Sequence, residues 1–131
     1  MLYAILAYHE EAAITALTAE QDASLMDNLL KTHETIDAED GKLGPTARLD
    51  FTGKAVTLRG HEPMVLDGPF AETKEQLLGF YTIDCESLED AVSAARRLRR
   101  ANPTAVYEIR PVILYLPGTA FPVTAAEEAS A

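Results

Sequence analysis

Two helix starts constrain the fold of this chain more than any other feature. Thr18-Ala-Glu-Gln21 has the capping-box pattern, in which a Thr hydroxyl and a Gln amide satisfy backbone N–H groups of the first turn. Ser87-Leu-Glu-Asp90 is a second start, with a capping hydroxyl and early acidic residues. Apolar residues follow both starts at three- to four-residue spacing. We therefore predict a helix from Thr18 to about Glu39 and another from Ser87 to Asn102-Pro103.

Extended segments surround these helices. Runs of apolar, aromatic or β-branched residues predict strands at Leu2–Tyr8, Arg48–Phe51, Ala55–Leu58, Leu77–Cys85 and Ala105–Arg110, with Val112–Leu116 still extended after Pro111. Thr52-Gly53-Lys54 separates the second and third runs, which predicts a hairpin between them with a three-residue loop. Gly79 lies inside the fourth run and indicates a bulge or the close approach of another backbone or a ligand.

The order strand, helix, hairpin, loop, strand, helix, strand is typical of an α+β protein with a ferredoxin-like antiparallel sheet and two helices on one face. The chain of 131 residues has the size of one domain, which we assign to residues 1–116. The helices leave the second face of the sheet uncovered, so we expect a homodimer in which another copy covers it. The Ala- and Pro-rich tail, residues 117–131, is expected to pack on the partner subunit.

The amino-acid composition limits the kinds of molecule that this chain can bind. Apolar residues make up 47% and charged residues 24% of the chain, a balance typical of globular proteins. The net charge of −10 disfavours nucleic acid and anionic membranes, since both would repel it. The single cysteine, Cys85, excludes an intramolecular disulfide and fits a reducing compartment. The N-terminal apolar run is short for a signal peptide or a membrane span, so we expect a cytoplasmic protein.

The most unusual stretch is Met64–Asp84, M-V-L-D-G-P-F-A-E-T-K-E-Q-L-L-G-F-Y-T-I-D. Asp67, Glu72 and Glu75 lie close together there, with Lys74 between them. Such groups can shift one another's pKa values enough for acid–base chemistry, so Asp67 and Glu72 are candidate catalytic residues. Lys74 and Glu75 are candidate ligand-binding residues. Three acids without the spacing of a calcium loop are weak support for a metal site, so we expect neither a metal nor a cofactor.

Other side chains have a functional and a structural interpretation. His9 follows a strand end and can reach the same cleft, and Arg110 can cross to a loop acid as an ion pair or an anion clamp. Both are candidate ligand-binding residues. Asp67-Gly68-Pro69 can simply form a turn, with the carboxylate accepting backbone N–H groups. His33, at the edge of an apolar helix stripe, fits a structural role, and His61 fits a solvated turn.

At Asp67–Asp84 the sequence closely resembles the DGPF proteins of the YCII-related family. The Gly44-Pro45 break, the S-L-E-D-A helix start at Ser87 and the E-I-R-P ending at Glu108–Pro111 also recur in that family's pattern. The resemblance extends over about Met1–Leu116. It implies a dimeric α+β barrel.

The same resemblance implies two different kinds of function. Some YCII relatives resemble small enzymes in which a helix His pairs with an Asp, and one branch resembles dehydrochlorinases of chlorinated hydroquinones. This chain departs from that pattern, because Leu29 stands at the His position and His33 lies one helical turn further on. Members of the DGPF branch are often encoded beside alternative sigma factors, which implies a link to transcription regulation.

Two hypotheses follow. The first is a small dimer that binds or transforms a small organic molecule in a cleft formed with the loop of residues 67–76. The alternative is a non-catalytic interaction or regulatory module that docks through this loop or through the arginine cluster, which comprises Arg96, Arg97, Arg99 and Arg100. A purely structural role for the loop is the third possibility.

Overall fold

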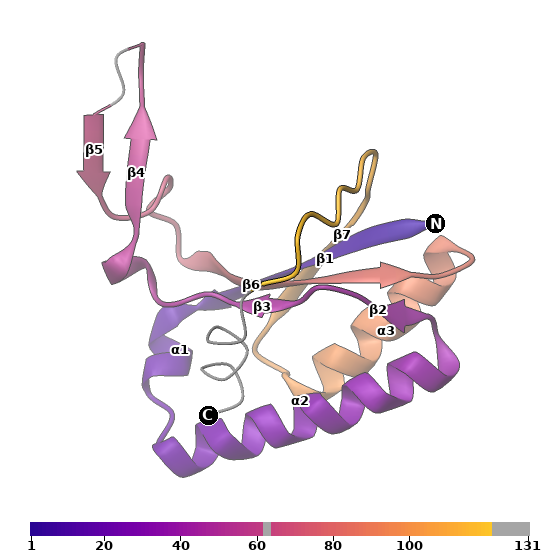
Figure 1. The fold of residues 1–131 in the computed structure, drawn as a ribbon. Coiled ribbons are helices and arrows are strands. Elements are labelled where there is room, and N and C mark those ends of the chain that lie inside the picture. Colours follow the sequence, from indigo (N-terminus) through magenta and orange to yellow (C-terminus); the bar gives the residue numbers. More distant parts are fainter. Residues whose placement is uncertain (62–63, 122–131) are drawn as a thin grey trace.

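The computed structural model describes residues 1–61 and 64–121, in which an antiparallel sheet carries two long helices on one face (Figure 1). The helices are α2 (Ala19–Glu39) and α3 (Leu88–Ala101), and α1 (Glu11–Thr15) is a short turn after the first strand. The main sheet has the order β2 (Lys42–Leu43), β6 (Glu75–Asp84), β1 (Leu2–Glu10), β7 (Val106–Pro111), and β3 (Ala47–Arg48) also pairs with β6. The α+β class is confirmed, and the arrangement is consistent with the ferredoxin-like plan. The sheet of the single chain is open and does not close into a barrel.

Local capping fixes the helix starts as the sequence predicts. The Thr18 hydroxyl accepts a hydrogen bond from the Gln21 backbone N–H at 3.1 Å, and the Gln21 side chain accepts one from the Thr18 backbone at 2.9 Å. The Ser87 hydroxyl accepts a hydrogen bond from the Asp90 backbone N–H at 3.3 Å. Both predicted helices are therefore confirmed, nearly to the residue.

The core lies between the sheet and the helices. Alternate residues of β1 are buried against α2 and α3, namely Tyr3, Ile5, Ala7 and His9, while the residues between them are half-buried on the other face. The cluster is completed by Leu29, Ile36, Tyr81, Ile83, Cys85, Ala91, Ala94, Ala95 and Leu98. Small alanines on α3 allow close packing of this helix. No helix of residues 1–61 and 64–121 lies over the other face of the sheet (Figure 1).

The predicted hairpin between residues 48 and 58 is wrong. β3 pairs with β6 of the main sheet, and Thr52–Lys54 form a 3-10 turn. A hydrogen bond from the Thr52 backbone N–H to Glu11 Oε1, 3.0 Å long, attaches this turn to the end of β1 and the start of α1. The chain therefore leaves the main sheet at the turn, and β4 (Val56–Arg59) pairs with β5 (Met64–Asp67) instead. After Pro111 no further strand forms in the described part of the chain.

Gly79 is where β3 meets the main sheet. The pairing of β1 with β6 shifts here, because Ala7 faces Gly79 and Tyr8 faces Leu77, which leaves Leu78 as a bulge. A Cβ atom on Gly79 would lie 2.9 Å from the Ala47 carbonyl oxygen. Both predicted roles of Gly79, bulge and close approach, are therefore confirmed.

A buried carboxylate ties α2 to α3, and its loss is expected to destabilise the protein. Asp40 accepts hydrogen bonds from Ser93 Oγ at 2.7 Å and from Arg97 Nε at 2.8 Å, and its side chain is only 5% exposed. Asp40→Ala should lower the free energy of unfolding by roughly 1–2 kcal/mol, since it leaves two donors without this acceptor. Urea unfolding followed by circular dichroism measures the change.

Asp27→Ala is the matched control on the same helix. Asp27 pairs with Lys31 at 3.0 Å, but both side chains are more than half exposed. Its removal should therefore cost no more than about 0.5 kcal/mol. Equal losses for the two variants would contradict a special role for Asp40.

Candidate functional site

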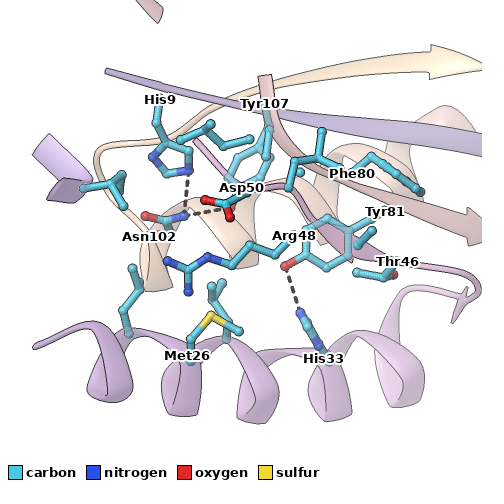
Figure 2. Close-up of a pocket in the computed structure, with 18 of the residues that line it drawn as sticks. His9, Met26, His33, Thr46, Arg48, Asp50, Phe80, Tyr81, Asn102 and Tyr107 are labelled. Atoms are coloured by element: carbon cyan, nitrogen blue, oxygen red, sulfur yellow. Dashed lines mark hydrogen bonds between the residues drawn. The ribbon is translucent and has the colours of Figure 1, made fainter. Parts of the chain in front are cut away.

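A cavity of about 660 Å³ lies between the sheet, helix α2 and the segment of residues 46–51 (Figure 2). Its volume falls in the range usual for small-molecule sites. Most of its walls are apolar and are formed by Ala7, Ile14, Leu25, Met26, Leu29, Leu30, Ala47, Leu49, Phe51, Leu78, Gly79 and Phe80. The polar groups are few: His9, His33, Thr46, Arg48, Asp50, Tyr81, Asn102 and Tyr107.

The first polar group joins β1, the end of α3 and β7. Asn102 Nδ2 lies 3.3 Å from His9 Nε2 and 3.4 Å from the Tyr107 hydroxyl, as Figure 2 shows. His9 is 6% and Asn102 5% exposed, so both are enclosed by protein. An amide N–H that donates to Nε2 leaves the proton of a neutral His9 on Nδ1.

His9 Nδ1 is buried and has no hydrogen-bond partner among the described residues. A buried polar group without a partner costs about 1–3 kcal/mol.

The second polar group joins α2 to β6. His33 Nε2 lies 2.9 Å from the Tyr81 hydroxyl, and the two rings meet edge to face with centroids 5.1 Å apart. Burial raises the pKa of Tyr81, so its hydroxyl stays protonated and can donate to Nε2. Within residues 1–61 and 64–121, no His forms a hydrogen bond with an Asp. The described residues therefore do not form the His–Asp pair that the resemblance implied, and His33 on α2 contacts a tyrosine.

Both imidazoles of the cavity are neutral at neutral pH. Burial lowers the pKa of His9 below 6.5, and the positive charge of Arg48 lowers it further. Burial also lowers the pKa of His33, although the Asp37 carboxylate opposes this shift. The enclosed part of the site thus combines apolar walls with uncharged hydrogen-bonding groups.

The two charged side chains of the cavity wall are exposed and already have partners. Arg48 forms an ion pair with Asp22 across to α2, with an Nη2–Oδ1 distance of 2.9 Å. Asp50 accepts hydrogen bonds from the Phe51 backbone N–H at 2.7 Å and from Lys54 Nζ at 3.1 Å. These contacts hold the pKa of Asp50 below its usual value. Each of these two charges is therefore already compensated by a partner, and neither is available to determine which ligand binds.

Of the residues that the sequence favours for a site, only His9 lines this cavity. The side chains of Asp67, Glu72 and Glu75 are exposed in the single chain, and Lys74 Nζ pairs with Glu10 Oε1 at 3.1 Å. A shared cleft between two copies, to which the loop would contribute these groups, stays a prediction.

The remaining candidates lie elsewhere on the surface. Arg110 is exposed on β7 and forms no ion pair with another described residue. Asp67 makes no side-chain hydrogen bond to a described residue, and the turn depends on Gly68, whose φ is +101°. Within the arginine cluster, Arg97 is bound to Asp40, and Arg99 Nε donates to the Ala105 carbonyl at 2.6 Å. Two of its four side chains therefore have structural contacts.

The loop after β5 is held by its own residues. The Gln76 amide donates to the carbonyls of Ala71, at 2.8 Å, and Thr73, at 2.9 Å. The Arg59 guanidinium lies 4.6 Å from the centre of the Phe70 ring.

The described residues contain no group of three or more His, Cys, Asp or Glu arranged to hold a metal ion. None of their helices is long and apolar enough to cross a membrane.

Comparison with known proteins assigns the chain to a family. The YCII-related domain matches residues 1–115. The chain belongs to the YCII-related family. An uncharacterized protein of Rhizobium meliloti (strain 1021) is 53% identical over 121 residues, which cover 90% of this chain and 97% of that protein. The resemblance in the sequence is thereby confirmed at the level of the family, and assignment to its DGPF branch stays a prediction.

The buried imidazoles of this YCII-related protein predict a loss of stability in acid. Because the folded-state pKa values of His9 and His33 are lowered, the unfolded chain binds these protons at higher pH than the folded protein does. The stability that these two neutral imidazoles contribute is fully present above the pKa of histidine in the unfolded chain, about 6.5. It is lost as the pH falls below that value. Urea unfolding between about pH 7.5 and pH 5.5 should show this decline, and a His9→Gln, His33→Gln double variant should reduce it. The exposed His61→Gln is the control; an equal reduction there would contradict the assignment.

Proposed function

We propose that this YCII-related protein binds a small, largely apolar organic molecule in the cavity between the sheet and α2. The observation that carries the proposal is the cavity itself, about 660 Å³ of space with apolar walls and a few buried neutral polar groups. Binding sites for small organic molecules combine these features.

The polar groups indicate what the molecule should carry. The Tyr107 hydroxyl accepts a hydrogen bond from the Asn102 amide, so its own proton can go to an acceptor such as a carbonyl oxygen, whereas the enclosed walls offer no free charge. Arg48 is paired with Asp22 and Asp50 with Lys54, so the charge of each is already compensated by its own partner. An uncharged molecule with an apolar body and one carbonyl or hydroxyl group fits this arrangement best.

A homodimer is part of the proposal. The sheet face opposite the helices presents the cross-strand pairs Leu6–Phe80 and Tyr8–Val106, and the Val106 side chain is 47% exposed. Two copies can cover each other through this face, which is the arrangement of a dimeric α+β barrel. In that dimer Asp67 and Glu72 would act as catalytic groups only if the loop of residues 67–75 reaches a shared cleft.

Titration with N-phenyl-1-naphthylamine, a neutral apolar dye whose fluorescence rises in apolar surroundings, tests the cavity. We expect saturable binding with one dye per chain and competition by 2-acetylnaphthalene, which combines an apolar body with a carbonyl. The shape-matched 2-ethylnaphthalene lacks the acceptor and should compete less well. A fluorescence that does not saturate, or the absence of any rise, would contradict the proposal.

A further inference from the structure

A second hollow lies between α2 and α3, the two helices that pack side by side on the sheet (Figure 1). Its volume is about 480 Å³, and its lining residues come from these two helices. It shares no lining residue with the cavity of about 660 Å³ beside the sheet. We call this hollow the helix groove. Its polar walls are formed by Asn28, Lys31, Thr32, Thr35, Arg97 and Arg100.

The ionisable side chains that line the helix groove are all cationic. Lys31 comes from α2, and Arg97 and Arg100 come from α3. Within residues 1–61 and 64–121, no acidic side chain lines the groove. The whole chain, in contrast, has 21 acidic and 11 basic residues and a net charge of −10. The helix groove is therefore a local reversal of the chain's charge, and it favours an anionic ligand.

Arg97 is held in position by a buried network. Its Nε atom donates a hydrogen bond to Asp40 Oδ2 at 2.8 Å, and Asp40 also accepts one from Ser93 Oγ at 2.7 Å. The Asp40 side chain is 5% exposed, whereas that of Arg97 is 30% exposed. The contact with Asp40 uses Nε, so the Nη groups of this guanidinium can donate to a ligand. An arginine that is already oriented loses little side-chain entropy when it binds an anion.

The other two cations are available to a ligand as well. Arg100, one turn after Arg97, forms no ion pair with another described residue. Lys31 Nζ pairs with Asp27 Oδ2 at 3.0 Å, but both side chains are more than half exposed. An exposed pair of this kind is weak in water, so Lys31 can exchange its partner for a ligand.

The uncharged groups of the wall differ in what they can offer. The Thr32 hydroxyl donates to the Asn28 carbonyl at 2.8 Å, so its proton is already in use. The side-chain amide of Asn28 has two N–H groups and adds a neutral donor beside the cations.

We propose that the helix groove binds a phosphate group, either free or as the monoester of a small organic molecule. Two guanidinium groups and an ammonium offer more donors than one carboxylate has oxygens, whereas a phosphate presents at least three terminal oxygens. Nucleic acid is a poor fit, because the acidic remainder of the chain repels a long polyanion. The proposal does not depend on the function proposed for the other cavity.

Titration of ¹⁵N-labelled protein with glycerol 3-phosphate and with inorganic phosphate tests the helix groove. At about pH 7.5 a phosphate monoester carries nearly two negative charges. We expect saturable shifts of the backbone amides of Lys31, Thr32, Arg97 and Arg100 with at least one of the two compounds. Tighter binding of glycerol 3-phosphate indicates a monoester, and tighter binding of inorganic phosphate indicates the free ion. Glycerol, and sodium chloride at the same ionic strength, should leave these amides unmoved.

Arg100→Gln and Arg96→Gln form a matched pair of variants. Both arginines are exposed on α3 and lie one turn apart, but only Arg100 lines the helix groove. Each change removes one positive charge, and circular dichroism should show that both variants keep their fold. We expect Arg100→Gln to weaken phosphate binding by about tenfold and Arg96→Gln by less than about twofold.

Three results would overturn the proposal. The first is that neither phosphate compound gives saturable shifts at the four amides. The second is that sodium chloride reproduces the shifts, which would make them an effect of ionic strength. The third is that Arg96→Gln and Arg100→Gln weaken binding equally, since the site would then depend on net charge and not on the groove.

Discussion

Replacing Ala7 by phenylalanine is expected to abolish binding of N-phenyl-1-naphthylamine while leaving the protein folded. Ala7 is 7% exposed, lies on the helix-facing side of β1 and lines the cavity. A benzyl side chain there can enter existing space without displacing other residues. We expect at least a tenfold loss of dye affinity, about 1.4 kcal/mol, with little change in the free energy of unfolding. Dye titration and urea unfolding of the same sample measure both quantities.

Ala94→Phe is the matched control for this substitution. Ala94 is also buried, at 0% exposure, but lies on α3 in the packed core and does not line the cavity. The new ring has no space there, so the variant should lose roughly 1–3 kcal/mol of stability or more. If Ala7→Phe destabilises the protein as much as Ala94→Phe does, the space beside Ala7 is not a preformed cavity.

Replacing Gly79 by alanine is expected to damage stability and binding together. The new Cβ atom would lie 2.9 Å from the Ala47 carbonyl oxygen, closer than backbone contacts allow. β3 must then move away from β6, and with it the cavity wall that contains Arg48. We expect a loss of roughly 1–3 kcal/mol in stability and weaker dye binding.

Gly53→Ala separates this contact from the general effect of a glycine change. Apart from Gly53 and its two chain neighbours, no atom of the described residues lies within 4 Å of a Cβ at Gly53, and its φ is not positive. Its stability should stay within about 0.5 kcal/mol of the wild type, with unchanged dye affinity. If Gly53→Ala and Gly79→Ala lose equal stability and dye affinity, the close approach of β3 to Gly79 is not the cause of these losses.

The sequence predicts the helices well because their signals are local. The Thr18 capping box and the Ser87 cap involve residues within one turn, so no distant part of the chain decides them. Strand pairing is decided by distant residues. The alternation at residues 55–58 indicates a strand but not its partner, and a contact with Glu11 redirects the chain at Thr52.

The cavity could be predicted only in part. His9 continues the alternation of Tyr3, Ile5 and Ala7, so the two-residue period of β1 already places an imidazole on the core-facing side. Asn102 is recognised in sequence as a helix stop, and nothing local indicates that its amide reaches across to His9. The loop of residues 67–75 attracts attention by its composition, whereas the cavity is formed by ordinary apolar residues from five separate elements.

Titration of ¹⁵N-labelled protein with N-phenyl-1-naphthylamine, followed through backbone amide shifts, tests the central claim most directly. If the dye binds in the cavity, the largest changes should occur at Ala7, His9, Arg48 and Gly79, on three strands that line it. Changes confined to the exposed loop of residues 67–75, with these four amides unmoved, would contradict it.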